Sequence, residues 1–245
     1  MSVCWLEQTE ADLPIDNQWL SVRERVCLNG LHFAKRRSDW RLGRWTAKHA
    51  VAACLNLPAN MRALADIEVL AGASGAPQVF LQNRPAEIAI SLSHRDGRGL
   101  CTVAPAGTSF GCDLEAIECH SDAFIADYCT SEEQELIARI PLEHRDLLVC
   151  LMWSAKESAL KALRVGLRLD TRSVCVRPAH WSLEAHGNAW QELCIQRLDS
   201  NPDGWRPLSV RCAGGPIYQG WWRVQDQMMR TTVCEEALEI PFRMR

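Results

Sequence analysis

Residues 147–167 read LLVCLMWSAKESALKALRVGL, and this stretch predicts a long helix with polar chemistry along one side. Leucines recur at helical spacing, and no proline or glycine interrupts the run before its last two residues. Trp153, Glu157 and Lys161 follow at intervals of four, so they share one helix face, with Lys156 beside them. That face offers a carboxylate for a cation and an ammonium group for a phosphate. An ordinary exposed Glu–Lys pair is the alternative that this stretch leaves open.

The composition describes a globular protein. A chain of 245 residues with 47% hydrophobic content can form one large domain or two smaller ones with sizeable cores. Its formal net charge of −3 argues against extensive nucleic-acid binding, so we expect any phosphate binding to be local. No run of eighteen apolar residues predicts a membrane span. The twelve cysteines are scattered without a CxxC pair and no signal core opens the chain, which predicts reduced thiols and a cytoplasmic location.

A second predicted helix is strongly basic. Either Ser38 or Asp39 is expected to cap a helix that runs to about Leu55, ahead of Pro58. The free N–H groups of a helix N-terminus and the forked donors of arginine both suit a phosphate. A solvated basic face is the alternative. The six cations at the start and in the first turns are Lys35, Arg36, Arg37, Arg41, Arg44 and Lys48.

The order of the predicted elements indicates an α+β fold. A helix within residues 16–31 and the basic helix precede short strands in residues 65–104, which should form one small antiparallel sheet. The second half repeats this order, although no clear sequence repeat accompanies it. We therefore expect two similar subdomains, 1–108 and 109–245, with the chemistry at their seam. The strands expected in the second half are 110–115, 173–177, 192–198, 208–212, 218–224 and 230–234.

Two short motifs precede the opening helix. In SLSHRDG, an alternating strand ends in a polar turn, so Ser93 and His94 can meet a phosphate oxygen; a surface histidine is the alternative. In the strand FGCDLE, Asp113 and Glu115 share the face opposite Cys112. Two carboxylates on one strand face repel each other unless a cation lies between them. Hard oxygen ligands of this kind suit Mg²⁺, whereas an exposed polar face is the alternative.

Taken in order, SLSHRDG, GCDLE and, about forty residues later, WSAKESALKA resemble the three signature segments of the 4′-phosphopantetheinyl transferases of the surfactin-synthetase-associated (Sfp) type. In that family the segments read S-x-S-H, G-x-D-x-E and W-x-x-K-E-x-x-x-K. The resemblance covers residues 91–167 closely and extends more loosely to the basic helix. It implies two similar α+β halves in one chain, with coenzyme A and Mg²⁺ bound in the cleft between them.

The resemblance also implies the reaction and its partners. Such an enzyme moves the phosphopantetheine arm of coenzyme A onto a serine of an apo acyl or peptidyl carrier protein and releases adenosine 3′,5′-bisphosphate. The carrier is expected to dock on an apolar surface after the acidic strand, in residues 116–128, with Ala123, Phe124 and Ile125 as candidates. We expect a monomer that uses neither a membrane nor nucleic acid.

The resemblance assigns roles to the matching residues. Asp113, Glu115 and Glu157 would hold Mg²⁺ on the pyrophosphate. Glu157, or a water that it orients, is the candidate base for the serine hydroxyl, and His94 is the alternative base. Lys161 would stabilise or protonate the leaving phosphate oxygen. The residues expected to contact the phosphates of coenzyme A are Ser93, His94, Lys156 and Lys161, with Arg36, Arg37 and Arg44 as candidates for the 3′-phosphate.

Three departures from the family pattern concern coenzyme A. The turn Gly75-Ala76-Pro77 stands where many members have Gly-Lys-Pro, so one cation is missing, for which Arg84 or the basic helix can compensate. Arg164 stands where a glycine is often found. Ala116 also replaces a usual basic residue. These changes bear on substrate affinity more than on catalysis.

Two other classes of function remain open. A Mg²⁺-dependent hydrolase of a nucleotide pyrophosphate would use the same carboxylates and cations, but it would release free phosphopantetheine. A non-catalytic module that binds carrier proteins would keep the surface without needing Glu157 or Lys161.

Overall fold

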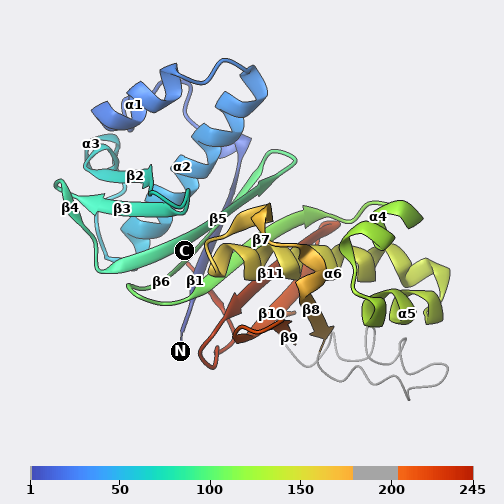
Figure 1. Ribbon diagram of the computed structural model, residues 1–245. Helices are drawn as coiled ribbons and strands as arrows, with labels where there is room; N and C mark the ends of the chain where they lie inside the picture. Colours follow the sequence, from blue (N-terminus) through green and yellow to red (C-terminus); the bar gives the residue numbers. More distant parts are fainter. Residues whose placement is uncertain (1, 179–203, 245) are drawn as a thin grey trace.

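The protein is described here by a computed structural model, which describes residues 2–178 and 204–244 (Figure 1). It has an α+β fold with several sheets. The first half contains β1 (Cys4–Thr9), η1 (Glu10–Asp12), α1 (Val22–Asn29), α2 (Ala34–Cys54), α3 (Met61–Ala65), β2 (Ile67–Ala71), β3 (Pro77–Leu81), β4 (Arg84–Pro85), β5 (Ile88–Arg95) and β6 (Arg98–Pro105). The remaining elements are β7 (Phe110–Ala116), α4 (Asp122–Tyr128), α5 (Ser131–Arg139), α6 (Leu142–Ala162), η2 (Gly166–Arg168), η3 (Thr171–Ser173), β8 (Val174–Pro178), β9 (Arg206–Cys212), β10 (Ile217–Gln225), β11 (Met228–Cys234) and β12 (Phe242–Arg243).

Each of the two long helices packs on one of the two larger sheets. Helix α2 packs on the sheet β12-β1-β6-β5, and α6 packs on the sheet β7-β11-β10-β9-β8. A third sheet, β2-β3-β4, lies beside α1 and α3, whereas α4 and α5 lie at the opposite end of the molecule (Figure 1). The final strand β12 runs parallel to β1, so the end of the chain returns to the first sheet.

The two halves meet at β7. Cys112 and Leu114 are buried in an apolar cluster with Trp5 and Leu100 from the first sheet. Asp113, the residue between them, faces the other way, since its carboxylate meets Lys161 of α6. The predicted alternation along this strand is therefore confirmed, and both of its faces are covered, because the first sheet lies against one and α6 against the other.

Several predicted elements differ from the structure. The first helix begins only at Val22, where Ser21 caps it, and α2 begins at Ala34, before the predicted caps. The strands of residues 65–104 belong to two sheets, and β1 was not predicted. These differences arise because tertiary pairing, which local pattern does not encode, decides strand partners. The strand predicted at residues 192–198 lies outside the described residues.

Two further observations concern the cysteines and the hydropathy of the helices. The described cysteines are all free thiols, although many are buried. Within residues 2–178 and 204–244, no helix is both long enough and apolar enough to cross a membrane.

Candidate active site

The site begins where α6 touches β7. A side chain at Gly111 would place its Cβ 2.0 Å from the Ser158 carbonyl oxygen, so glycine is what lets the helix approach the strand so closely. The hydroxyl groups of Ser154 and Ser158 both meet the Thr231 hydroxyl oxygen of β11, at 2.9 and 2.7 Å. These hydrogen bonds hold α6 against β11, and the polar face of α6 thereby lies next to Asp113.

Asp113 is the centre of the cluster. Its Oδ1 accepts hydrogen bonds from Lys161 Nζ at 2.7 Å and from Ser93 Oγ at 2.8 Å, so residues of β5, β7 and α6 meet at one oxygen. Burial acts to lower the pKa of Lys161, but the Asp113 carboxylate outweighs it and holds that pKa above its usual value. The other oxygen, Asp113 Oδ2, is buried without a hydrogen-bond partner in the described part of the chain.

Glu115 is held in place from both sides. Trp153 Nε1 donates a hydrogen bond to Glu115 Oε1 at 3.0 Å, and Arg95 Nη1 lies 3.6 Å from Oε2. Burial and the neighbouring Asp113 raise the pKa of Glu115 to about 7, which the Trp153 hydrogen bond and Arg95 only partly oppose. Hence Trp153 orients an acidic group instead of only packing in the core.

Glu157 completes the predicted acidic set. Its Oε1 is buried without a hydrogen-bond partner among the described residues, and burial together with Asp113 raises its pKa. In the described ranges, no group of three or more His, Cys, Asp or Glu side chains is already arranged to hold a metal ion. Two buried, unpartnered carboxylate oxygens and mutually repelling acids nevertheless fit a hard divalent cation, which would relieve both penalties.

The raised pKa of Glu115 predicts how the stability of the metal-free protein depends on pH. Between its usual value of 4.5 and about 7, the folded state retains a proton that the unfolded state has lost. The stability from this group is therefore complete at low pH and is lost as the pH rises through 7. We expect Glu115→Gln to gain about 2 kcal/mol in unfolding free energy over the unmodified protein between pH 5 and pH 8.

Urea denaturation in excess chelator measures this difference at each pH. The Glu115 side chain is 20% exposed, so little solvent screening is expected. Parallel stability profiles for the two proteins would show that Glu115 ionises as readily in the folded chain as in the unfolded chain.

A cavity of about 960 Å³ lies beside this cluster and is lined by both halves of the chain. Lys161 lines it and also contacts Asp113, so it connects the cavity to the carboxylates. His94, at the exposed end of the SLSH motif, lines the same cavity. The other basic residues in its wall are Lys35, Arg36, Arg44, Arg164 and Arg168. The site thus combines a cationic cavity with an acidic edge.

The structure divides the predicted basic helix into two groups. Lys35, Arg36 and Arg44 reach the cavity, and Arg44 stacks over the Trp40 ring at 4.8 Å. Arg37 does not line it. The Arg37 guanidinium donates to the backbone carbonyls of Leu28 and Leu31 at 2.8 and 3.1 Å, which corrects its predicted role at a phosphate.

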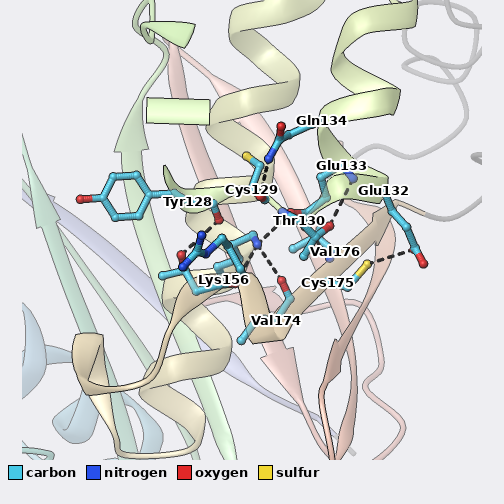
Figure 2. A network of polar contacts seen from close by, with 12 residues as sticks. Tyr128, Cys129, Thr130, Glu132, Glu133, Gln134, Lys156, Val174, Cys175 and Val176 are labelled. Carbon is cyan, nitrogen blue, oxygen red and sulfur yellow. Dashed lines mark hydrogen bonds and ion pairs between the residues drawn. The ribbon is translucent and has the colours of Figure 1, made fainter. Parts of the chain in front are cut away.

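Two predicted phosphate ligands bind protein groups instead. Ser93 is buried and donates to Asp113, and it does not line the cavity. Lys156 is buried; its Nζ lies 2.8 Å from Glu133 and donates to the carbonyls of Thr171 and Val174 at 2.8 and 2.6 Å (Figure 2). Although Lys156 precedes Glu157 in the sequence, it belongs to the opposite side of α6.

The predicted docking helix is only partly exposed. Ile125 is buried in the core of the second half, and Phe124 stacks on Trp153 and Tyr128, with ring centroids 5.3 and 4.7 Å apart. Ala123 is exposed on the same helix. Ile125 is thus a core residue, which corrects its assignment to a free apolar surface, whereas Phe124 is only partly buried and supports Trp153.

Sequence reasoning missed four functional candidates. Arg164 and Arg168 lie in a loop whose approach to the first half no local pattern shows. Arg95 follows directly after His94 in the segment SLSHRDG, so its place in that motif could have identified it as a candidate. The spacing of four predicts the face on which Trp153 lies, but not its hydrogen bond to Glu115.

Fold and site together define an α+β protein with a cationic cavity beside buried carboxylates, which is the arrangement of a site for a phosphorylated substrate. Residues 109–203 match the model of the 4′-phosphopantetheinyl transferase superfamily. The chain is also 26% identical over 215 residues to the 4′-phosphopantetheinyl transferase HetI of Nostoc sp. (strain PCC 7120), covering 82% of this chain and 87% of that protein. These matches confirm the predicted resemblance to the 4′-phosphopantetheinyl transferases and, with it, the prediction of an enzyme of this type.

Two solved structures are similar to part of the chain. A holo-(acyl-carrier-protein) synthase from Bacillus anthracis, in complex with coenzyme A (3′,5′-ADP), has a TM-score of 0.35 and 20% identity over 41% of this chain and 91% of its own. Helicobacter pylori holo-[acyl-carrier-protein] synthase, in complex with coenzyme A, has a TM-score of 0.35 and 16% identity over 42% of this chain and 99% of its own.

Proposed function

We propose that this enzyme transfers 4′-phosphopantetheine from coenzyme A to a serine of an apo acyl or peptidyl carrier protein, in a Mg²⁺-dependent reaction of the Sfp type. The observation that carries the proposal is the junction at Lys161. This residue lines the cationic cavity and is hydrogen-bonded to the central carboxylate, so a polyanion in the cavity would meet the acidic cluster there. The name of the relative HetI supports the same transfer reaction.

The carboxylates Asp113, Glu115 and Glu157 would hold the Mg²⁺. When bound, the ion supplies charge neutralisation at the pyrophosphate. The protein supplies the positions: Ser93 and Lys161 fix Asp113, while Trp153 and Arg95 fix Glu115.

The proton chemistry is assigned to α6. Glu157, whose pKa is raised by burial and by Asp113, is the proposed base that takes the serine proton, directly or through a water. Lys161 remains protonated because Asp113 raises its pKa, so it can stabilise the leaving phosphate oxygen. His94 lines the cavity and is the alternative base.

Mass spectrometry of purified apo carrier proteins tests the function. After incubation with enzyme, coenzyme A and Mg²⁺, we expect a carrier that has gained one phosphopantetheine group, with release of adenosine 3′,5′-bisphosphate. Excess chelator should abolish the gain and added Mg²⁺ should restore it. Free phosphopantetheine with an unmodified carrier would identify a hydrolase instead, and coenzyme A left intact with every carrier would contradict catalysis.

We also propose that the two halves are similar subdomains, on the evidence of two matching buried ion pairs. In the second half, Glu133 caps α5 at the Thr130 N–H (2.7 Å), pairs with Lys156 (2.8 Å) and accepts from the Val176 N–H (2.8 Å). These contacts form one network (Figure 2).

The first half contains the same network. Glu24 caps α1 at the Ser21 N–H (2.9 Å), pairs with Lys48 (2.5 Å) and accepts from the Val69 N–H (3.0 Å). In both halves a lysine of the long helix also donates to two backbone carbonyls. A shared helix, cap, ion pair and strand contact in the same chain order supports a common subdomain plan.

The two lysines lie in similar sequences. Residues 45–50 read WTAKHA and residues 153–158 read WSAKES, so a short sequence repeat accompanies the shared network. Aligned in this way, His49 corresponds to Glu157 and Ala53 to Lys161. The three carboxylates and Lys161 therefore belong to the second half, while the first half supplies Ser93, His94 and cavity-lining cations.

Docking of the carrier is testable on α4. Carrier proteins of this kind are expected to be acidic, so Ala123→Asp should raise the KM for the carrier about tenfold by charge repulsion, with the KM for coenzyme A unchanged. Ala138→Asp, the same change on the exposed surface of α5, is the matched control. Steady-state kinetics with each substrate varied separately would disprove this docking surface if both variants had the carrier KM of the unmodified enzyme.

A further inference from the structure

Arg164 has an unusual backbone conformation for an arginine. It follows Leu163, the C-cap of α6, with a φ of +57°, in the left-handed region. Its N–H donates to Lys161 O at 3.0 Å, and the Val165 N–H donates to Leu160 O at 3.2 Å, which closes the helix end. Glycine is the usual residue at this position because a Cβ makes the conformation costly. For the conformation of the helix end alone, glycine would therefore be more favourable than arginine.

The Arg164 side chain is exposed and lines the cavity. In the same loop, Arg168 uses its guanidinium to donate to Val165 O at 3.0 Å and, more weakly, to Arg164 O at 3.5 Å. By contrast, no hydrogen bond or ion pair within the described chain engages the Arg164 guanidinium. The loop thus braces the backbone of Arg164 and leaves its charged end available to a ligand.

The surroundings of this guanidinium favour an anion. Across the cavity, the turn Ser74-Gly75-Ala76-Pro77 contributes no charge, while α2 contributes Lys35, Arg36 and Arg44. Among the lining residues, all of which are described, the one carboxylate is Asp39, and Lys35 pairs with it at 3.3 Å. The positive charge of the cavity is therefore largely uncompensated, and Arg164 adds to it from the second half.

We propose that Arg164 binds a phosphate group of coenzyme A and sets the affinity of the enzyme for this substrate. The inference rests on the proposed function, since it takes coenzyme A as the occupant of the cavity. A phosphate provides several acceptors for the forked donors of a guanidinium, and this pairing is stronger than a neutral hydrogen bond. The free energy of that contact offsets the cost of placing an arginine in the left-handed region.

Two variants separate the side chain from the backbone. Asparagine tolerates the left-handed region and glycine prefers it, so Arg164→Asn and Arg164→Gly both relieve the backbone while removing the charge. We expect melting temperatures equal to or above that of the unmodified enzyme. The KM for coenzyme A should rise about tenfold, as for the loss of one hydrogen bond to a charged group, with kcat within about twofold.

Arg62→Asn is the matched control, because Arg62 of α3 is an exposed arginine that does not line the cavity. It should leave the KM for coenzyme A unchanged. Calorimetric titration of coenzyme A into each protein should show the same pattern in the dissociation constant. Equal affinities in the Arg164 variants and the unmodified enzyme would overturn the proposal, as would an equal loss in Arg62→Asn.

The titration also separates the two proposals. If the unmodified enzyme bound coenzyme A but modified no carrier, the transferase function would fail while the role of Arg164 could still be measured. If carriers were modified normally and the Arg164 variants kept full affinity, only the role of Arg164 would fail.

Discussion

Replacing Asp113 by asparagine is expected to lower kcat for carrier modification by about 10³-fold or more, the largest catalytic effect that the site predicts. Its carboxylate contacts both Lys161 and Ser93, and it would also hold the metal. Asparagine keeps the size but removes the charge, so it weakens the cation site and removes the ion-pair partner of Lys161. Single-turnover assays on the folded variant, checked by circular dichroism, measure the loss.

Cys112→Ser is the matched control for Asp113→Asn. Cys112 is the adjacent residue, faces the seam between the sheets, and has its Sγ 3.3 Å from the Ser91 carbonyl oxygen, a contact that a serine hydroxyl can keep. We expect this variant to retain activity within about threefold, because its side chain lies on the other side of the strand. Similar catalytic losses in the two folded variants would contradict the proposed role of Asp113.

The second large effect concerns stability. Lys156→Met should cost about 3–5 kcal/mol of unfolding free energy, because it leaves the Glu133 carboxylate buried without its partner. Both side chains are only 1% exposed, so water cannot take over the role of the ammonium group. Chemical denaturation measures the loss. Adding Glu133→Leu should recover part of it, since the unpaired charge is then removed as well.

Lys48→Met provides the comparison in the other half. Its pair with Glu24 is fully buried, so we expect a stability loss of similar size. If Lys156 were instead a phosphate ligand, the folded Lys156→Met/Glu133→Leu variant would show a raised KM for coenzyme A. We expect that KM to be unchanged, because Lys156 does not line the cavity.

The sequence predicts which site residues share a face of β7 and of α6, because these positions follow local periodicities. A period of two along β7 places Asp113 and Glu115 on one face, and a spacing of four along α6 places Trp153, Glu157 and Lys161 on another. The α+β class follows in the same way from alternating strands and amphipathic helices. These patterns depend on backbone geometry that each segment carries with it, so no tertiary information was needed.

Only the tertiary structure decided which cations face the cavity. Arg36 and Arg37 are neighbours in the sequence, yet Arg36 lines the cavity while Arg37 caps carbonyls at the end of α1. Lys156 and Lys161 lie on one helix, but Lys156 is enclosed by Glu133 and two carbonyls whereas Lys161 meets Asp113. In the sequence, every lysine and arginine carries the same formal charge, whatever its position. Its role depends on which partner folding brings within hydrogen-bonding distance, and the partners here come from segments far apart in the chain.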